Sequence, residues 1–423
     1  MPSLPGTGNK IIRIAERMKR LGTETAFSVS EEARELASRG KKIYPFHLGD
    51  MNIRTPSRII EATKKAMDNG KTGYCPPAGI PELREAIAKE VGETRGLKLT
   101  KENVSVQPGG KPVISKFILA FMNPGDEVLY PNPGYPIYES QIKFHGGIPK
   151  PYRFKHGEEG FVLDFDFLEK SVSSKTRIFI FNNHHNPVGA ELDERKMEML
   201  AKFCLKHNLL VLSDEAYFDI SFSGRQKSIA SYPGMFERTV ILYTFSKKFA
   251  MTGWRLGAAV GPKWMIEQIT RLNVNEESCS NHFIQWGALE GLRACREETK
   301  RIISILRERR DAACEILKTI RGVEVAKPNS TFYLFPDVTE AMKNLGFTDV
   351  EEFRKYILET TGVSFCTRKH FGTPMDGEER EYIRLALSGI EKDEIREGLL
   401  KFKEAVENPD MIRKWREQRS ARF

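Results

Sequence analysis

The sequence predicts an α/β fold built on a mostly parallel sheet, and two patterns indicate it. From about residue 80 to 260, short apolar segments alternate with amphipathic helical patterns. Several of these segments are apolar at consecutive positions, which is typical of strands covered on both faces. Because strand–helix–strand alternation favours parallel pairing, we expect one large sheet between layers of helices.

Six strands and three helices are expected in this region. The strands are Asn103–Val106, Glu127–Tyr130, Arg177–Phe181, Leu209–Leu212, Thr239–Thr244 and Leu256–Val260. The helices are Lys111–Met122, Pro136–Phe144 and Asp193–His207.

After residue 263 the pattern changes to a mixture of helices and strands. Helical patterns occur near Glu297–Arg321 and Val350–Thr360 and in a closing helix, Lys392–Glu407, with strand-like segments at Thr331–Phe335 and Tyr382–Ala386. Such a mixture is typical of an α+β unit, which we expect to pack with the N-terminal segment. The predicted division is a large domain, residues 60–296, and a smaller domain from both chain ends, residues 1–59 and 297–423.

Composition excludes several classes of protein. The chain of 423 residues is 40% hydrophobic and 29% charged, which is globular rather than disordered. Its longest apolar run, Phe117–Met122, is far shorter than the ~20 residues of a membrane-spanning helix. No apolar signal-peptide core follows the first residues, and the six cysteines and eight histidines lack ligand spacing. We therefore expect a cytoplasmic protein with reduced thiols, no membrane contact and no metal site.

The net charge of +9 is concentrated at the two ends of the chain. Residues 1–20 contain five Lys or Arg and one Glu, and residues 408–423 contain five Lys or Arg and two acidic residues. A nucleic-acid-binding protein is expected to carry a basic stripe on its folded body instead. We interpret the ends as solvated tails and expect no nucleic-acid partner.

Three short motifs follow predicted strands. In Val106-Gln-Pro-Gly-Gly-Lys-Pro112, two glycines lead into a helix start, a place where backbone amides can bind phosphate. It matches neither GxGxxG nor GxxxxGK[ST], which argues against dinucleotides and nucleoside triphosphates. The other two motifs, Phe181-Asn-Asn-His-His-Asn-Pro-Val-Gly189 and Ser213-Asp-Glu-Ala-Tyr217, lie at strand ends where open α/β sheets bind ligands. His184 and His185 either form a loop turn or pack near that ligand.

The strongest motif is the segment from Tyr243 to Gly257, Tyr-Thr-Phe-Ser-Lys-Lys-Phe-Ala-Met-Thr-Gly-Trp-Arg-Leu-Gly. A lysine beside hydroxyl groups, with an arginine eight residues later, suits attack on a carbonyl while the other groups hold a phosphate. Either Lys247 or Lys248 could be that nucleophile.

In order along the chain, from about Thr23 to Glu407, these motifs resemble the class I/II, fold-type-I pyridoxal-phosphate aminotransferases. The family pattern Ser-Lys-x-x-x-x-x-Gly-x-Arg-x-Gly corresponds to Ser246–Gly257 and identifies Lys247 as the Schiff-base lysine. The resemblance implies pyridoxal phosphate as cofactor, an amino acid and a 2-oxo acid as substrates, and a homodimer with shared active sites.

The resemblance also implies a role for each matching residue. Asp214 pairs with the pyridine nitrogen and keeps it protonated, Tyr217 and Asn186 contact the phenolic oxygen, and Lys247 carries the proton between Cα and the cofactor. The phosphate contacts come from Gly110, the Lys111 backbone, Thr244 and Arg255, with Tyr135 stacked on the ring and Tyr74 reaching the neighbouring subunit's phosphate. The expected substrate contacts are Arg384 on the carboxylate, Gly49 opposite it, Asn186, and Lys111 on the distal carboxylate of an aspartate-type substrate.

The expected activity is therefore transamination by a ping-pong mechanism. A carbon–sulfur β-lyase on the same fold is the alternative, because a His-Asn-Pro-Val-Gly string also occurs in those relatives. A non-catalytic regulator that keeps the fold is the third possibility. The segment Gly49-Asp-Met-Asn-Ile53 departs from the family pattern of Gly, Asp or Glu, Pro, Asp and Phe, and aspartate, glutamate, alanine and aromatic donors all stay open.

Overall fold

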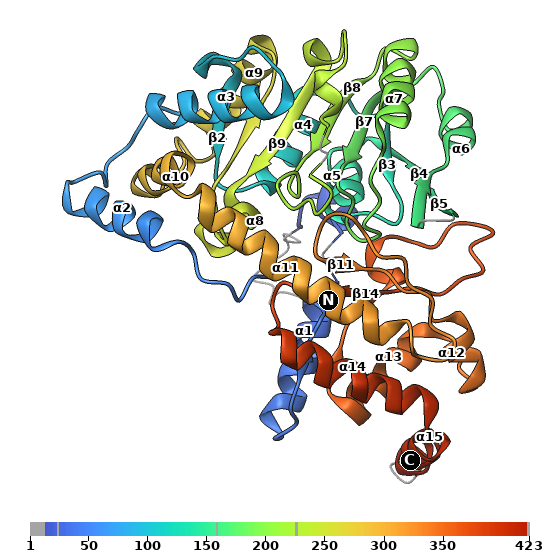
Figure 1. The fold of residues 1–423 in the computed structure, drawn as a ribbon. Coiled ribbons are helices and arrows are strands. Elements are labelled where there is room, and N and C mark those ends of the chain that lie inside the picture. The colour runs from blue at the N-terminus through green and yellow to red at the C-terminus, as the bar shows by residue number, and fades with distance from the viewer. Residues whose placement is uncertain (1–12, 23–24, 158–159, 225–226, 421–423) are drawn as a thin grey trace, which may run out of the picture.

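A seven-stranded sheet between helices forms the upper part of the computed structural model, which describes residues 13–22, 25–157, 160–224 and 227–420 (Figure 1). In spatial order its strands are β2 (Val104–Gln107), β10 (Gly257–Val260), β9 (Thr239–Thr244), β8 (Leu210–Asp214), β7 (Thr176–Asn182), β3 (Glu127–Pro131) and β4 (Ile148–Tyr152). The strands from β9 to β4 pair in parallel, and β10 is antiparallel to both its neighbours. The expected mostly parallel sheet is thus confirmed.

The sequence patterns did not predict the edge strand β4 or the hairpin of β5 (Phe154–Gly157) and β6 (Gly160–Leu163). Strand β4 contains Pro149 and Pro151. Proline cannot donate a ladder hydrogen bond, so it weakens the strand signal and is tolerated at a sheet edge.

Helices cover the sheet because their apolar residues recur three and four positions apart. In α4 (Lys111–Phe121), Val113, Ile114, Phe117 and Ile118 are buried against β8 and β9. The other helices of this part are α2 (Ser57–Asp68), α3 (Pro81–Arg95), α5 (Ile137–Phe144), α6 (Phe165–Lys170), α7 (Glu194–Lys206), α8 (Phe245–Lys248), α9 (Lys263–Glu276) and α10 (His282–Ala294).

The long helix α11 (Arg296–Leu317) runs from this part into the lower part, where segments from both chain ends lie together (Figure 1). Its strands are β1 (Tyr44–Pro45), β11 (Tyr333–Leu334), β12 (Val363–Ser364), β13 (Cys366–Thr367) and β14 (Ile383–Ala386). Its other helices are α1 (Ala26–Ser38), α12 (Thr339–Asn344), α13 (Val350–Thr361), α14 (Lys392–Glu407) and α15 (Pro409–Ser420).

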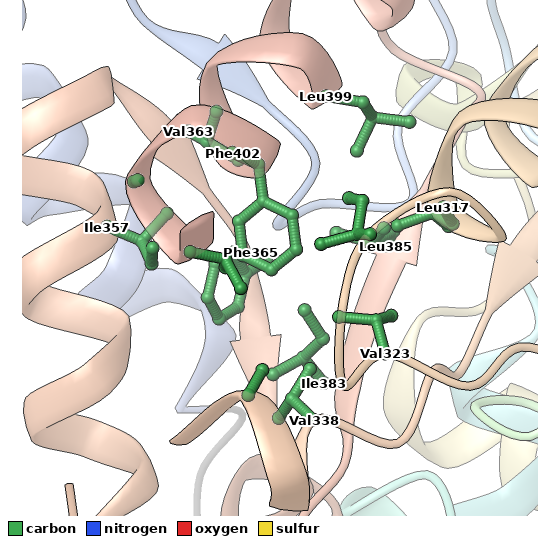
Figure 2. Close-up of a cluster of buried hydrophobic side chains, with 14 of the residues drawn as sticks. Leu317, Val323, Val338, Ile357, Val363, Phe365, Ile383, Leu385, Leu399 and Phe402 are labelled. Atoms are coloured by element: carbon green, nitrogen blue, oxygen red, sulfur yellow. The ribbon is translucent and has the colours of Figure 1, made fainter. Parts of the chain in front are cut away.

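The contacts that join the N-terminal segment to the C-terminal one include a strand pairing and an ion pair. Strand β1 pairs in parallel with β12, and Glu32 of α1 accepts a hydrogen bond from Arg354 of α13 at 2.8 Å. The lower part has its own apolar core, in which the rings of Phe365 and Phe402 meet edge to face (Figure 2). These observations support the proposed division into residues 60–296 and the two terminal segments, whose boundaries stay a prediction.

The interpretation of residues 408–423 as a solvated tail is wrong for most of that segment. Residues Pro409–Ser420 form α15, so Lys392–Glu407 is not the closing helix, and Ile412 and Trp415 of α15 are buried. Apolar positions three apart supply the buried face, which the count of basic residues concealed. At the other end, residues 16–20 form an exposed 3₁₀ helix, while residues 1–12 and Thr23 lie outside the described residues.

Candidate active site

A cavity of about 400 Å³ lies where β8 and β9 end, α4 begins and the two parts of the molecule meet. All the predicted site residues except Tyr74 line it: Gly49, Gly110, Lys111, Tyr135, Asn186, Asp214, Tyr217, Thr244, Lys247, Arg255 and Arg384. The fold brings them together because parallel strands present their carboxyl ends at one sheet edge.

Asp214 ends β8, is buried and lines the cavity. Its carboxylate accepts hydrogen bonds from the Tyr138 hydroxyl at 2.6 Å and from the Ala216 backbone N–H at 3.1 Å. Burial nevertheless raises the pKa of Asp214 to about 6. A cationic partner in the cavity would reverse this shift, so the site favours a positively charged group next to Asp214.

The two adjacent lysines of the strongest motif point into different surroundings. Lys247 lines the cavity, and its ammonium donates a hydrogen bond to the Gly49 carbonyl. Lys248 is buried outside the cavity, where it contacts Glu90 at 2.5 Å and Asp219 at 3.2 Å. Burial lowers the pKa of Lys248, but Tyr243 and the two carboxylates together outweigh burial and raise this pKa, so the lysine stays charged and unreactive.

A cradle for an anion surrounds the start of α4. Gly110 precedes the first turn, and among the described residues no side chain caps it. Gly109, with φ of 106°, lies so close to Arg255 that an added Cβ would be 2.3 Å from a guanidinium nitrogen. The Thr244 hydroxyl donates to the Ser246 hydroxyl at 3.0 Å, and both residues line the cavity. A helix start, a guanidinium and hydroxyl groups together suit a phosphate.

Arg384 of β14 is the buried cation on the other side of the cavity. It donates to the Asn186 side chain at 3.4 Å and to the His47 carbonyl, while its Nε is buried with no hydrogen-bond partner among the described residues. The rings of Tyr333 and Phe371 both lie 4.7 Å from its guanidinium. A buried guanidinium that lines a cavity and has an unsatisfied donor suits a carboxylate ligand.

Sequence reasoning missed two tyrosines of the site. Tyr138 bonds Asp214, and the Tyr333 hydroxyl lies 2.8 Å from that of Tyr217. The partners are 76 and 116 positions apart in the sequence, so no local spacing could reveal them.

His184 and His185 do not line the cavity. Both are buried in the bend after β7, and burial lowers their pKa values to about 4 and about 3, so both rings are neutral near pH 7. The His185 ring packs 4.4 Å from Phe154, and His184 lies 3.7 Å from a Glu191 oxygen. Of the two interpretations of this pair, the loop turn agrees with the structure.

Comparisons with known proteins agree with this geometry. The family profile described as "Aminotransferase class I and II" matches residues 42–402. An aspartate aminotransferase of Sulfurisphaera tokodaii is 33% identical over 386 residues, which cover 91% of this chain and 95% of that protein. A probable aspartate/prephenate aminotransferase of Aquifex aeolicus is 32% identical over 400 residues, which cover 93% and 98%.

Similarity extends to solved structures. Aspartate aminotransferase from Thermus thermophilus with maleate has a TM-score of 0.86 at 29% identity, covering 93% of this chain and 100% of that one. Among the described residues, no helix is long and apolar enough to cross a bilayer. The chain thus belongs to the class I and II aminotransferases, with their fold-type-I architecture and their cofactor, pyridoxal phosphate.

Proposed function

We propose that this aminotransferase uses an acidic amino acid of the aspartate or glutamate type, and that the cavity binds it together with pyridoxal phosphate. The observation that carries the proposal is that one cavity of about 400 Å³ contains two cationic side chains, Arg384 and Lys111, in addition to Lys247 and the Arg255 of the phosphate cradle. A dicarboxylate needs two such cations, whereas a neutral amino acid needs one.

The residues of the cavity fit pyridoxal phosphate. Gly110, Thr244 and Arg255 would hold its phosphate, and the close approach of the Arg255 guanidinium to Gly109 supports this. Asp214 would pair with its ring nitrogen, and the raised pKa of this buried carboxyl supports a cationic partner. Tyr135 would cover the ring, with Tyr217 and Asn186 beside its phenolic oxygen. When bound, this cofactor supplies an electron sink for the bond that breaks at Cα and carries the amino group between the two substrates.

The chain itself supplies orientation and proton transfer. Arg384 would hold the α-carboxylate in a bidentate fork, with Asn186 and the Gly49 backbone nearby, so that the Cα–H bond faces Lys247. The Lys247 amine would then carry the proton from Cα to the cofactor, acting first as general base and then as general acid, and would carry it back in the reverse half-reaction. Each half-reaction ends with release of a 2-oxo acid or an amino acid, which gives ping-pong kinetics.

Lys111 would contact the distal carboxylate. It is the first residue of α4, lines the cavity, and places its ammonium 5.7 Å from the Tyr135 ring centroid and 6.0 Å from that of Phe27. Phe27 belongs to α1, so this end of the cavity is formed by both parts of the molecule.

A panel of amino donors tests the proposal. Aspartate, alanine and phenylalanine are assayed with 2-oxoglutarate, and glutamate with oxaloacetate. Lys111→Met should lower kcat/KM for aspartate and glutamate by about tenfold or more, because a charged hydrogen bond is lost, and should leave alanine within about twofold. Lys111→Arg, which keeps the charge, is the control. An equal loss for alanine would contradict the assignment of Lys111.

Assembly and location are part of the same proposal. Tyr74 is 88% exposed and lies outside the cavity of its own chain, which supports a homodimer in which it completes the neighbouring site. The six cysteines are all free, which supports a reducing, cytoplasmic location.

A further inference from the structure

Tyr333 contacts both sides of the proposed active site. Its hydroxyl is 2.8 Å from the Tyr217 hydroxyl, and its ring lies 4.7 Å from the Arg384 guanidinium. The side chain is buried and lines the cavity. It therefore joins the residue proposed for the cofactor's phenolic oxygen to the residue proposed for the substrate carboxylate.

The backbone around Tyr333 holds its side chain in place. An added Cβ on Gly49 would lie 2.2 Å from the Tyr333 hydroxyl oxygen, so this hydroxyl fits directly against the Gly49 backbone. Thr331, two residues earlier, has φ of 64°, a conformation that β-branched residues rarely adopt, and its hydroxyl accepts from the Tyr333 N–H at 3.2 Å. Backbone strain of this kind persists where the surroundings enforce it, often at functional sites.

The hydrogen bond between the Tyr217 and Tyr333 hydroxyls has a preferred donor if Tyr217 acts on the cofactor. A phenol carries one proton, so Tyr217 can donate into the cavity only when Tyr333 donates to Tyr217. Charged groups near the pair include Asp214 and Arg384, and the Lys247 ammonium lies 5.4 Å from the centroid of the neighbouring Phe332 ring. A donor behind Tyr217 polarises its O–H bond and makes it a stronger donor.

The ring of Tyr333 acts on Arg384. A planar guanidinium between two aromatic rings is held in one plane, and Tyr333 and Phe371 are those rings. Fixing this plane holds the Arg384 guanidinium, which lines the cavity, in one orientation for a bidentate carboxylate.

We propose that Tyr333 is a positioning residue of the transamination site: its hydroxyl orients and strengthens Tyr217 as a donor, and its ring fixes the plane of Arg384. This rests on the roles proposed above for Tyr217 and Arg384. The two functions use different atoms of one side chain, so two substitutions separate them.

Tyr333→Phe removes the hydroxyl and keeps the ring. In the holoenzyme, the pH at which the cofactor's visible absorption band changes should rise by about 0.3 unit or more, because a weaker Tyr217 donor stabilises the charged phenolic oxygen less. KM for amino and 2-oxo acids should change less than about twofold. Tyr333→Leu should produce the same spectral shift and also raise KM for every substrate by roughly 2- to 30-fold, the range of a lost cation–π contact.

Two controls make the test decisive. Tyr356→Phe removes another buried tyrosine hydroxyl, which donates to the Ala405 carbonyl at 2.8 Å far from the cavity, and should leave the band and KM at parental values. In a Tyr217→Phe background, Tyr333→Phe should cause no further spectral shift. If Tyr217→Phe does not change the pH at which the absorption band changes, the proposed role of Tyr217 is wrong. If Tyr217→Phe changes that pH and Tyr333→Phe does not, the inference about Tyr333 is overturned.

Discussion

Lys247 and Lys248 show how one step along the chain changes the chemistry of a side chain. The motif allows either residue to be the nucleophile, and the structure places one in the cavity and the other between Glu90 and Asp219. Both belong to the short helix α8, where consecutive side chains point in directions about 100° apart. A lysine locked between carboxylates keeps its proton, which makes it a poor nucleophile.

We expect Lys247→Ala to abolish turnover and the cofactor's visible absorbance, and Lys248→Met to retain the covalent linkage to the cofactor. The Lys248 variant should instead lose roughly 1–3 kcal/mol of unfolding free energy, because it leaves the half-buried carboxylates of Glu90 and Asp219 without their lysine partner. Borohydride trapping with peptide mapping, and denaturant unfolding, check the two parts. A trapped cofactor on Lys248 would reverse the assignment.

The protonation state of Asp214 affects both catalysis and the stability of the folded protein. The ordinary pKa of an aspartate side chain is 3.8, and that of Asp214 in the folded protein is about 6. Between these values the unfolded chain loses the proton while the folded protein keeps it, so stability falls as pH rises from about 4 to 6. Above pH 6 the buried charge is a cost that a bound cationic ring nitrogen would offset.

Asp214→Asn should therefore stabilise the cofactor-free protein at pH 7 by up to about 3 kcal/mol, and not at pH 3.5. The same variant should cut the turnover rate by orders of magnitude, since a neutral amide cannot keep the ring nitrogen protonated. Denaturant unfolding at both pH values and steady-state kinetics measure these effects. A stability difference that is independent of pH, or near-parental activity, would show that Asp214 does not act in this way.

At the scale of elements, α15 converts part of a basic chain end into packed structure. The Trp415 indole N–H donates to Glu359 at 2.7 Å, and its ring meets Tyr356 edge to face at 5.4 Å. The basic side chains extend from the same helix; Arg416, for example, donates to the Leu345 carbonyl at 3.0 Å. The helix thus packs on α13 and α14 and extends the core of the lower part.

Trp415→Ala is expected to cost about 3–5 kcal/mol, the usual effect of truncating a buried large aromatic side chain. Trp264→Ala is the matched control, because Trp264 on α9 is 48% exposed and should cost well under half as much. Thermal and denaturant unfolding of both variants measure the difference. Equal effects would mean that α15 does not pack as described.

At the scale of the whole molecule, the proposed homodimer makes each active site depend on two chains. Tyr74 lies in the turn between α2 and α3, and its exposure contrasts with the buried site residues Asp214 and Arg384. An exposed tyrosine next to a conformationally restricted Pro-Pro pair is a suitable interface residue.

Mixing Tyr74→Phe and Lys247→Ala proteins tests this assembly. In a heterodimer, the site that keeps Lys247 would receive an intact Tyr74 from the other chain, so activity per Lys247-containing subunit should rise above that of Tyr74→Phe alone. Sedimentation and a tag on one chain verify that heterodimers form. If they form without a gain, or if the active species is a monomer, Tyr74 does not complete a neighbouring site.

The sequence by itself determined the elements that surround the site. The six predicted strands and the predicted helices occur within a few residues of their expected positions, whereas the sequence patterns did not predict α2 and α3. The reason is local: alternating or consecutive apolar residues indicate which faces are buried, and glycine and proline at a strand end indicate the turn that follows. Gly110, Asp214 and Lys247 each belong to a motif at the end of one strand. Local structure therefore determines where each of these residues lies relative to its own strand.

Only the tertiary structure decided which distant side chains meet. Tyr138 with Asp214, Tyr333 with Tyr217 and Arg384, and the burial of Trp415 depend on strand order and helix packing, which residue spacing does not encode. The reversed strand β10 and the proline-containing edge strand β4 are set in the same way, by the neighbours that supply their hydrogen bonds. The conformational preferences of neighbouring residues specify a strand or a helix. The contacts of a catalytic side chain are specified instead by the packing of segments that are far apart in the sequence.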